Sequence, residues 1–85
     1  MPKFEVEVKV MPRAGLLDPQ GEAVEHALSA LDFADIAEVR VGRAISIRLE
    51  RRDRETALAD AREMCNKFLA NPITEDYSVA VRGSS

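Results

Sequence analysis

Few side chains in this sequence could carry out chemistry. Its 85 residues include one cysteine, Cys65, and one histidine, His26. Cys65 lies on the apolar stripe of a predicted helix, where a thiol is typically buried and unreactive rather than nucleophilic. His26 lies on the polar side of another predicted helix, which favours a solvated or interface histidine over a general base. A zinc site needs several such ligands together, so we expect neither a catalytic centre nor a metal site.

The sequence also lacks motifs for nucleotides and nucleic acids. "PRAG" and "VGRA" are too short to be phosphate-binding loops, and no Walker A or G-x-G-x-x-G pattern occurs. The 15 acidic and 12 basic residues give a net charge of −3, whereas nucleic-acid binding favours a basic surface. Phe4 and Tyr77 belong to apolar strand faces that we expect to meet helices, not bases. We therefore expect no bound cofactor and no nucleic-acid partner.

Regular patterns near the start of the chain predict a strand and a helix. Apolar and charged residues alternate over 4–10, which predicts a strand with one apolar face. Asp18 followed by Pro19 is typical of a helix N-cap and first helical position. The helix should run from Pro19 to about Leu31. Its apolar stripe is Val24, Ala27, Leu28 and Leu31.

Two further alternating runs, 36–41 and 45–49, predict a β-hairpin in the middle of the chain. They flank Gly42 and Arg43, where glycine can adopt the positive φ of a two-residue turn. The hairpin would supply the second and third strands of a sheet.

The strongest helix pattern follows this hairpin. Asp53 is the predicted N-cap, and Asn71-Pro72 ends the helix because proline disfavours helical geometry in the residue before it. A last strand is expected over about 74–81. The predicted buried stripe of the helix is Ala57, Leu58, Ala61, Met64, Cys65, Phe68 and Leu69.

The element order β-α-β-β-α-β predicts the α+β class. Two helices on one face of a four-stranded antiparallel sheet, the ferredoxin-like arrangement, would satisfy the short connections. A variant in which a helix and a strand are exchanged between protomers remains open. We expect a single domain over 1–82 and a frayed tail over 83–85. The other face of the sheet would be either a solvated face or a self-complementary dimer face, formed by Lys3, Glu5, Glu7, Lys9, Arg48, Glu50, Ser78 and Arg82.

The first residues, "MPKFEVEVKV", lack the charged region and apolar run of a signal peptide. No apolar run approaches the ~20 residues of a membrane-spanning helix. These features predict a cytoplasmic protein without a membrane partner.

The stretch "LLDPQGEAVEHAL" contains an unusual helix start. A hydrophobic staple would pair Leu17 with the fourth helical residue, but that residue is Glu22. Gly21 stands where a capping box has Glu or Gln, and it permits close approach by another backbone. Leu16 and Leu17 either cover the end of the protein's own core or form an exposed docking ridge.

The chain resembles the PurS family, the small subunits of phosphoribosylformylglycinamidine synthase, over about 4–81. The resemblance rests on the runs "LLDPQGEAVEHALSALDF", "EVRVGRAISIRL" and "MCNKFLANPITEDYSVAV". It implies a non-catalytic subunit that dimerises or forms tetramers. Such a subunit would bridge a large synthetase subunit, which uses ATP and Mg²⁺, to a glutaminase subunit and support ammonia transfer between them.

A stand-alone ferredoxin-like module that senses a small molecule is the competing interpretation. If the chain is instead an adaptor, we expect partner contacts from residues at the first helix, at the Gly42-Arg43 turn and at the Asn71-Pro72 segment, although the last of these could simply end a helix. These candidates are Leu16, Leu17, Asp18, Pro19, Gln20, Gly21, His26, Gly42, Arg43, Asn71 and Pro72.

Overall fold

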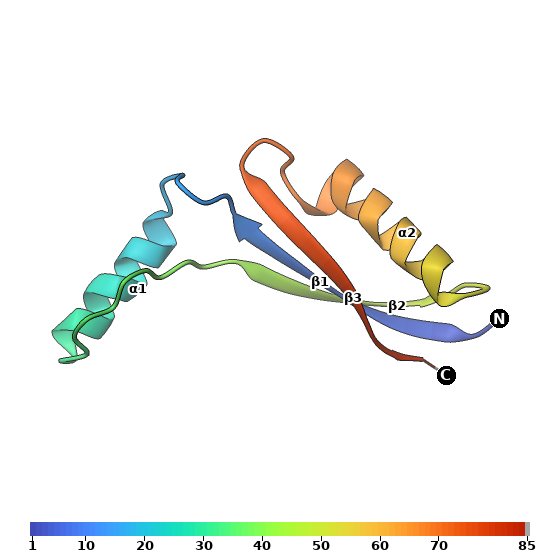
Figure 1. Ribbon diagram of the computed structural model, residues 1–85, viewed down its shortest axis with the longest axis horizontal. Coiled ribbons are helices and arrows are strands. Elements are labelled where there is room, and N and C mark those ends of the chain that lie inside the picture. Colours follow the sequence, from blue (N-terminus) through green and yellow to red (C-terminus); the bar gives the residue numbers. More distant parts are fainter. Residues whose placement is uncertain (85) are drawn as a thin grey trace.

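The computed structural model describes residues 1–84. Its elements are β1 (Lys3–Pro12), α1 (Pro19–Ala30), β2 (Arg43–Glu50), α2 (Arg54–Met64), the π-helical turn η1 (Cys65–Leu69) and β3 (Glu75–Ser84). Figure 1 shows a sheet covered by α2 and an arm, residues 14–42, that extends away from it. The molecule measures 51 × 27 × 14 Å with a radius of gyration of 16.3 Å, against about 12 Å for a compact chain of this length.

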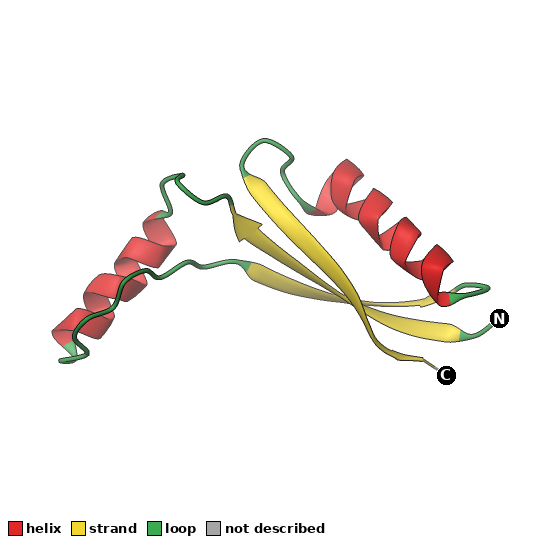
Figure 2. Ribbon diagram, in the orientation of Figure 1, coloured by secondary structure: helices red, strands yellow, loops and turns green. Residues whose placement is uncertain are grey.

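The sheet is antiparallel, with β1 between β2 and β3. Val8 pairs with Ile45 of β2 and with Val79 of β3, so one face of all three strands is apolar. α2 lies across that face (Figure 2). The centre of the core is therefore the row of β1 valines, Val6, Val8 and Val10, none of which has exposed surface.

The opposite face of the sheet carries the predicted charges of both signs. They form ion pairs such as Lys3 with Glu50 at 4.0 Å and Arg82 with Glu7 at 3.3 Å. Pairs this exposed contribute little to stability. Whether a second copy also contacts this face stays a prediction.

The predicted N-cap starts α2. The Asp53 carboxylate accepts a hydrogen bond from the Thr56 amide at 2.8 Å, which satisfies one of the free N–H groups of the first turn. Ala57, Ala61 and Cys65 follow at every fourth residue and are buried against the sheet. Small residues at these positions allow the helix to lie close to β1.

The π-helical turn changes which residues face the core. The Ala70 amide donates to the Cys65 carbonyl at 3.1 Å, and such an i→i+5 bond widens the turn. The next buried residue is therefore Ala70, five positions after Cys65. The prediction that Phe68 lies on the buried stripe is wrong, since its side chain is 86% exposed.

The α+β class and the antiparallel sheet are confirmed, but within this chain only α2 covers the sheet. α1 extends away from it, as Figure 1 shows. The apolar stripe of α1 is consequently left open: Val24 is 40% and Leu31 66% exposed. An amphipathic pattern indicates that a face will be covered without indicating by what.

The predicted hairpin is wrong. Residues 36–41 form no strand and run back beside α1, so the sheet has three strands and not four. The Val41 amide donates to the Asp18 carboxylate of the arm at 3.0 Å, so it is not available to a strand partner. Gly42 has no positive φ, which a hairpin turn at this position would require.

The end of the chain is more ordered than expected. Gly83 and Ser84, predicted to lie in a frayed tail, belong to β3 and pair with Glu5 and Phe4 of β1. The third residue of the predicted tail, Ser85, lies outside the described residues.

Candidate partner interface

Asp18 fastens the two chain segments of the arm together. Its Oδ2 accepts a hydrogen bond from the Val41 amide at 3.0 Å, and its Oδ1 accepts one from the Gly21 amide at 3.1 Å. These two bonds, the Val41 bond first, hold the pKa of the Asp18 carboxyl below its ordinary value. The residue therefore caps α1 as predicted and also anchors the segment that returns to β2.

Gly21 is the closest packing point within the arm. It is buried, and a Cβ at this position would collide with the Val39 carbonyl oxygen and approach the Asp18 carboxylate to 2.6 Å. The prediction that Gly21 allows another backbone to approach is confirmed. That backbone belongs to the same chain, so Gly21 shapes the arm from inside.

Leu16 and Leu17 lie at the start of the arm and do not cover the protein's own core. Their side chains are 48% and 74% exposed, and the neighbouring Pro19 and Gln20 are exposed as well. Of the two alternatives left by the sequence, the structure of the single chain supports an exposed ridge.

The tip of the arm presents further apolar surface. α1 ends in a Schellman-type turn in which Asp32, at φ 70°, occupies the left-handed position and the Phe33 amide donates to the Leu28 carbonyl at 3.1 Å. Phe33 is 58% and Leu31 66% exposed. His26 is exposed on α1. Sequence patterns did not predict this cap, because glycine usually occupies the left-handed position.

Gly42 lies where the arm meets the sheet. A Cβ on Gly42 would collide with the Val10 carbonyl oxygen and the Met11 sulfur. Glycine is thus required for close approach to β1 and not for a turn.

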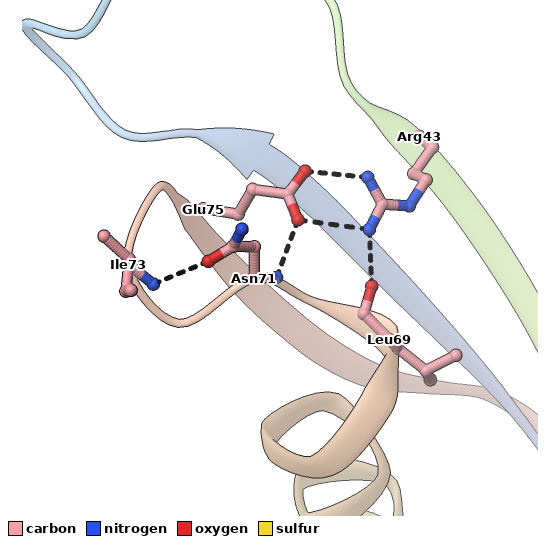
Figure 3. A network of polar contacts seen from close by, with 5 residues as sticks. All are labelled: Arg43, Leu69, Asn71, Ile73 and Glu75. Atoms are coloured by element: carbon pink, nitrogen blue, oxygen red, sulfur yellow. Dashed lines mark hydrogen bonds and ion pairs between the residues drawn. The ribbon is translucent and has the colours of Figure 1, made fainter.

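Arg43, the next residue, joins three distant parts of the chain (Figure 3). Its guanidinium donates to both carboxylate oxygens of Glu75, at 2.7 and 3.2 Å, and to the Leu69 carbonyl at 2.5 Å. The Asn71 amide donates to the same carboxylate at 2.7 Å. The Arg43 guanidinium, followed by the Asn71 amide, holds the pKa of Glu75 below its ordinary value.

Asn71 and Pro72 belong to this network, so the structure brings together three of the predicted residues, Arg43, Asn71 and Pro72. The Asn71 side chain accepts from the Ile73 amide at 2.9 Å, and the Pro72 carbonyl accepts from the Arg13 guanidinium at 2.6 Å. Arg13 was not predicted. Its only sequence signal is a charged residue directly after a strand, which is common.

A shallow apolar groove lies between β2 and α2. Its volume is about 480 Å³. Ionic side chains line its rim, including Arg51, which pairs with Asp60 of α2 at 2.5 Å. The apolar side chains of the groove are Ile45, Ile47, Met64, Phe68 and Leu69.

The structure also places the residues that could bind a metal or act as a nucleophile. Over 1–84, no three His, Cys, Asp or Glu side chains come together as metal ligands. Cys65 has no exposed surface, and its burial raises the pKa of the thiol, which disfavours the nucleophilic thiolate. No helix in this part of the chain has the length and hydropathy needed to cross a bilayer.

Comparison with known proteins gives a consistent result. Residues 5–83 match the family model described as "PurS: Phosphoribosylformylglycinamidine (FGAM) synthase". The PurS subunit of Bacillus subtilis is 38% identical over 78 residues, or 92% of each chain. That of Methanocaldococcus jannaschii is 33% identical over 78 residues, which cover 92% of this chain and 94% of the relative.

Solved structures agree over nearly the whole length. A PurS crystal structure from Thermotoga maritima superposes with a TM-score of 0.85 at 28% identity, covering 93% of this chain and 91% of that one. A chain of the PurLQS structure from the same organism gives 0.87 at 30% identity, with 95% and 99% covered. The match therefore includes the arm as well as the sheet, and the chain belongs to the PurS family of phosphoribosylformylglycinamidine synthase subunits.

Proposed function

We propose that this chain is a non-catalytic adaptor that joins a synthetase subunit to a glutaminase subunit and supports ammonia transfer between them. One observation carries the proposal: the arm presents the apolar side chains of Leu17, Leu31 and Phe33 to solvent, which is typical of a surface that a partner covers. A chain similar to this one is part of the PurLQS structure from Thermotoga maritima. In this proposal the chain belongs to a cytoplasmic enzyme complex of purine biosynthesis.

The reaction of the whole enzyme makes such an adaptor useful. Formylglycinamide ribonucleotide, glutamine and ATP become formylglycinamidine ribonucleotide, glutamate, ADP and phosphate. Ammonia released from glutamine must reach the second site without escaping into water, which requires a sealed and correctly oriented interface. In this proposal ATP and Mg²⁺ bind the large partner subunit, and this chain binds no cofactor.

The adaptor acts as a dimer or a tetramer. Each chain exposes an apolar helix face on α1 and an apolar groove between β2 and α2. Two copies related by a two-fold axis can cover both surfaces at once, because each copy supplies one of each kind. Covering them would also compensate for the thin core of a chain of this length.

Self-association is tested by changing the open face of α1. Val24→Ser with Leu31→Ser should weaken association at least about tenfold, since polar residues remove apolar area from the contact. Sedimentation velocity over a dilution series measures this effect. Glu22→Gln, on the polar side of the same helix, is the matched control. Equal association of the double variant and the control would contradict the dimer contact.

The adaptor role is tested by reconstitution. Glutamine-dependent formation of formylglycinamidine ribonucleotide is measured with the synthetase and glutaminase subunits, with and without this chain. Ammonia-dependent formation by the synthetase is followed in parallel. The adaptor should be required for the first activity and not for the second. If neither activity depends on it, the adaptor role is wrong, and binding of metabolites to the isolated chain becomes the next measurement.

A further inference from the structure

The arm is connected to the sheet at two points, and each has an arginine. Arg13 directly follows β1, and Arg43 is the first residue of β2. Both chain segments leave the sheet at the end where the loop that joins η1 to β3, residues 70–74, also lies, as Figure 1 shows. Within the described residues, α1 itself makes no extensive contact with the strands or with α2, and the bond from the Val41 amide to Asp18 joins the two arm segments to each other.

The two arginines hold the same loop from its two sides. Arg43 donates to the Leu69 carbonyl before the loop and to the Glu75 carboxylate after it. The Arg13 guanidinium donates to the Pro72 carbonyl, in the middle of the loop, at 2.6 Å. The Arg13 backbone amide donates to the Thr74 carbonyl at 2.9 Å.

Hydrogen bonds within the loop and to Glu75 hold it in one conformation. The Asn71 amide donates to Glu75 Oε1 at 2.7 Å, and the Glu75 amide donates back to the Asn71 carbonyl at 2.9 Å. The Asn71 side chain accepts from the Ile73 amide at 2.9 Å. The loop also follows directly from η1, whose first residue, Cys65, is buried in the core. It can therefore transmit the orientation of the core to the arm.

We propose that loop 70–74 and its two arginines form a clamp that sets the direction in which the arm leaves the sheet. Arg13, Arg43 and Glu75 are then positioning residues: they need not touch a partner, but they determine where the apolar face of α1 is presented. The clamp depends on the direction of each hydrogen bond. Position 43 must donate to the Leu69 carbonyl, and position 75 must accept from the Asn71 amide.

The clamp is tested by measuring the distance between arm and sheet. Spin labels are placed at Ser29→Cys on α1 and Ser78→Cys on β3, both exposed positions. Labelled chain is diluted with unlabelled chain, so that pulsed electron resonance reports distances within one chain. Buried Cys65 is left in place, and its labelling is checked in a chain without the two new cysteines.

The intact chain should give one narrow distance distribution. Arg43→Gln and Glu75→Gln should each broaden it, and Arg43→Lys, which keeps the charge but not the two-pronged donor, should broaden it less. Arg40→Gln is the matched control, because Arg40 lies in the arm and pairs with Glu38 at 3.6 Å. Circular dichroism and a second label pair within the sheet check that each variant is folded.

A charge-reversed double variant, Arg43→Glu with Glu75→Arg, separates the clamp from a simple ion pair. An ion pair would be restored by the exchange, whereas the clamp would stay broken because the Leu69 carbonyl and the Asn71 amide would face groups of the wrong kind. A narrow distribution in the double variant, or an unchanged one in both Arg43→Gln and Arg43→Lys, would overturn the proposal. This measurement uses the chain without other subunits, so its failure would leave the adaptor role standing.

Discussion

Val8 is the middle residue of the row of β1 valines at the centre of the core. It has no exposed surface, and it lies on the central strand between Ile45 and Val79. Val8→Ala removes two carbon atoms, a transfer cost of about 1.6 kcal/mol at ~0.8 kcal/mol for each. The space left behind raises the expected loss to about 2–3 kcal/mol, because packed strands relax only partly.

Such a loss is large for a chain of this length. At about 4–8 °C per kcal/mol, the melting temperature should fall by about 10–20 °C. Urea unfolding, followed by far-ultraviolet circular dichroism, measures the free energy of unfolding. The protomer concentration must be held constant, because self-association stabilises the folded state by mass action.

Two comparison variants make the result interpretable. Val8→Thr keeps the shape but buries a hydroxyl group in an apolar site, which costs about 1–3 kcal/mol. Ile73→Ala removes more atoms from a side chain that is 79% exposed, so its effect should stay within about 0.5 kcal/mol. A Val8→Ala midpoint no lower than that of Ile73→Ala would refute the assignment of the core to this row of β1 valines.

Two further predictions concern the arm and the clamp. Gly21→Ala should push the returning segment away from α1 and raise the rate of hydrogen exchange at the Val41 amide by about tenfold. Gly83→Ala is the control, because an added Cβ there meets nothing within 4 Å. Equal protection of the Val41 amide in the two variants would contradict the close packing at Gly21. Glu75 has a lowered pKa in the folded chain, so its contribution to stability is present above the ordinary value of 4.5 and is lost as the pH falls through the folded value. Glu75→Gln should therefore flatten the acid side of a plot of urea midpoint against pH, and an unchanged slope would show that the carboxylate does not contribute.

Sequence patterns identified the features that depend on near neighbours. The alternation in β1 and the Asp18 and Asp53 caps are local signals, and the structure confirms them. The same reasoning failed for η1, because a π-helical turn has no sequence pattern as regular as the α-helical repeat. Phe68 was consequently placed on the wrong side of the helix.

Long-range features could not be read from spacing. Arg43 and Glu75 are 32 positions apart, and exposed charged residues offer many alternative pairings. Residues 36–41 do alternate as a strand would. However, the Val41 amide donates its hydrogen bond to the Asp18 side chain and not to a neighbouring strand. The partner contacts of the eleven candidate residues stay predictions, since a single chain exposes such surfaces without showing what covers them.

The open arm also has a consequence for protein turnover. A chain that has not yet found its partners displays Leu17, Leu31 and Phe33 to the solvent. Exposed apolar side chains on an incompletely assembled protein are what chaperones and proteases engage. Surplus copies should thus be short-lived while assembled copies persist, which would match the amount of this small subunit to the supply of its partners without any dedicated regulator.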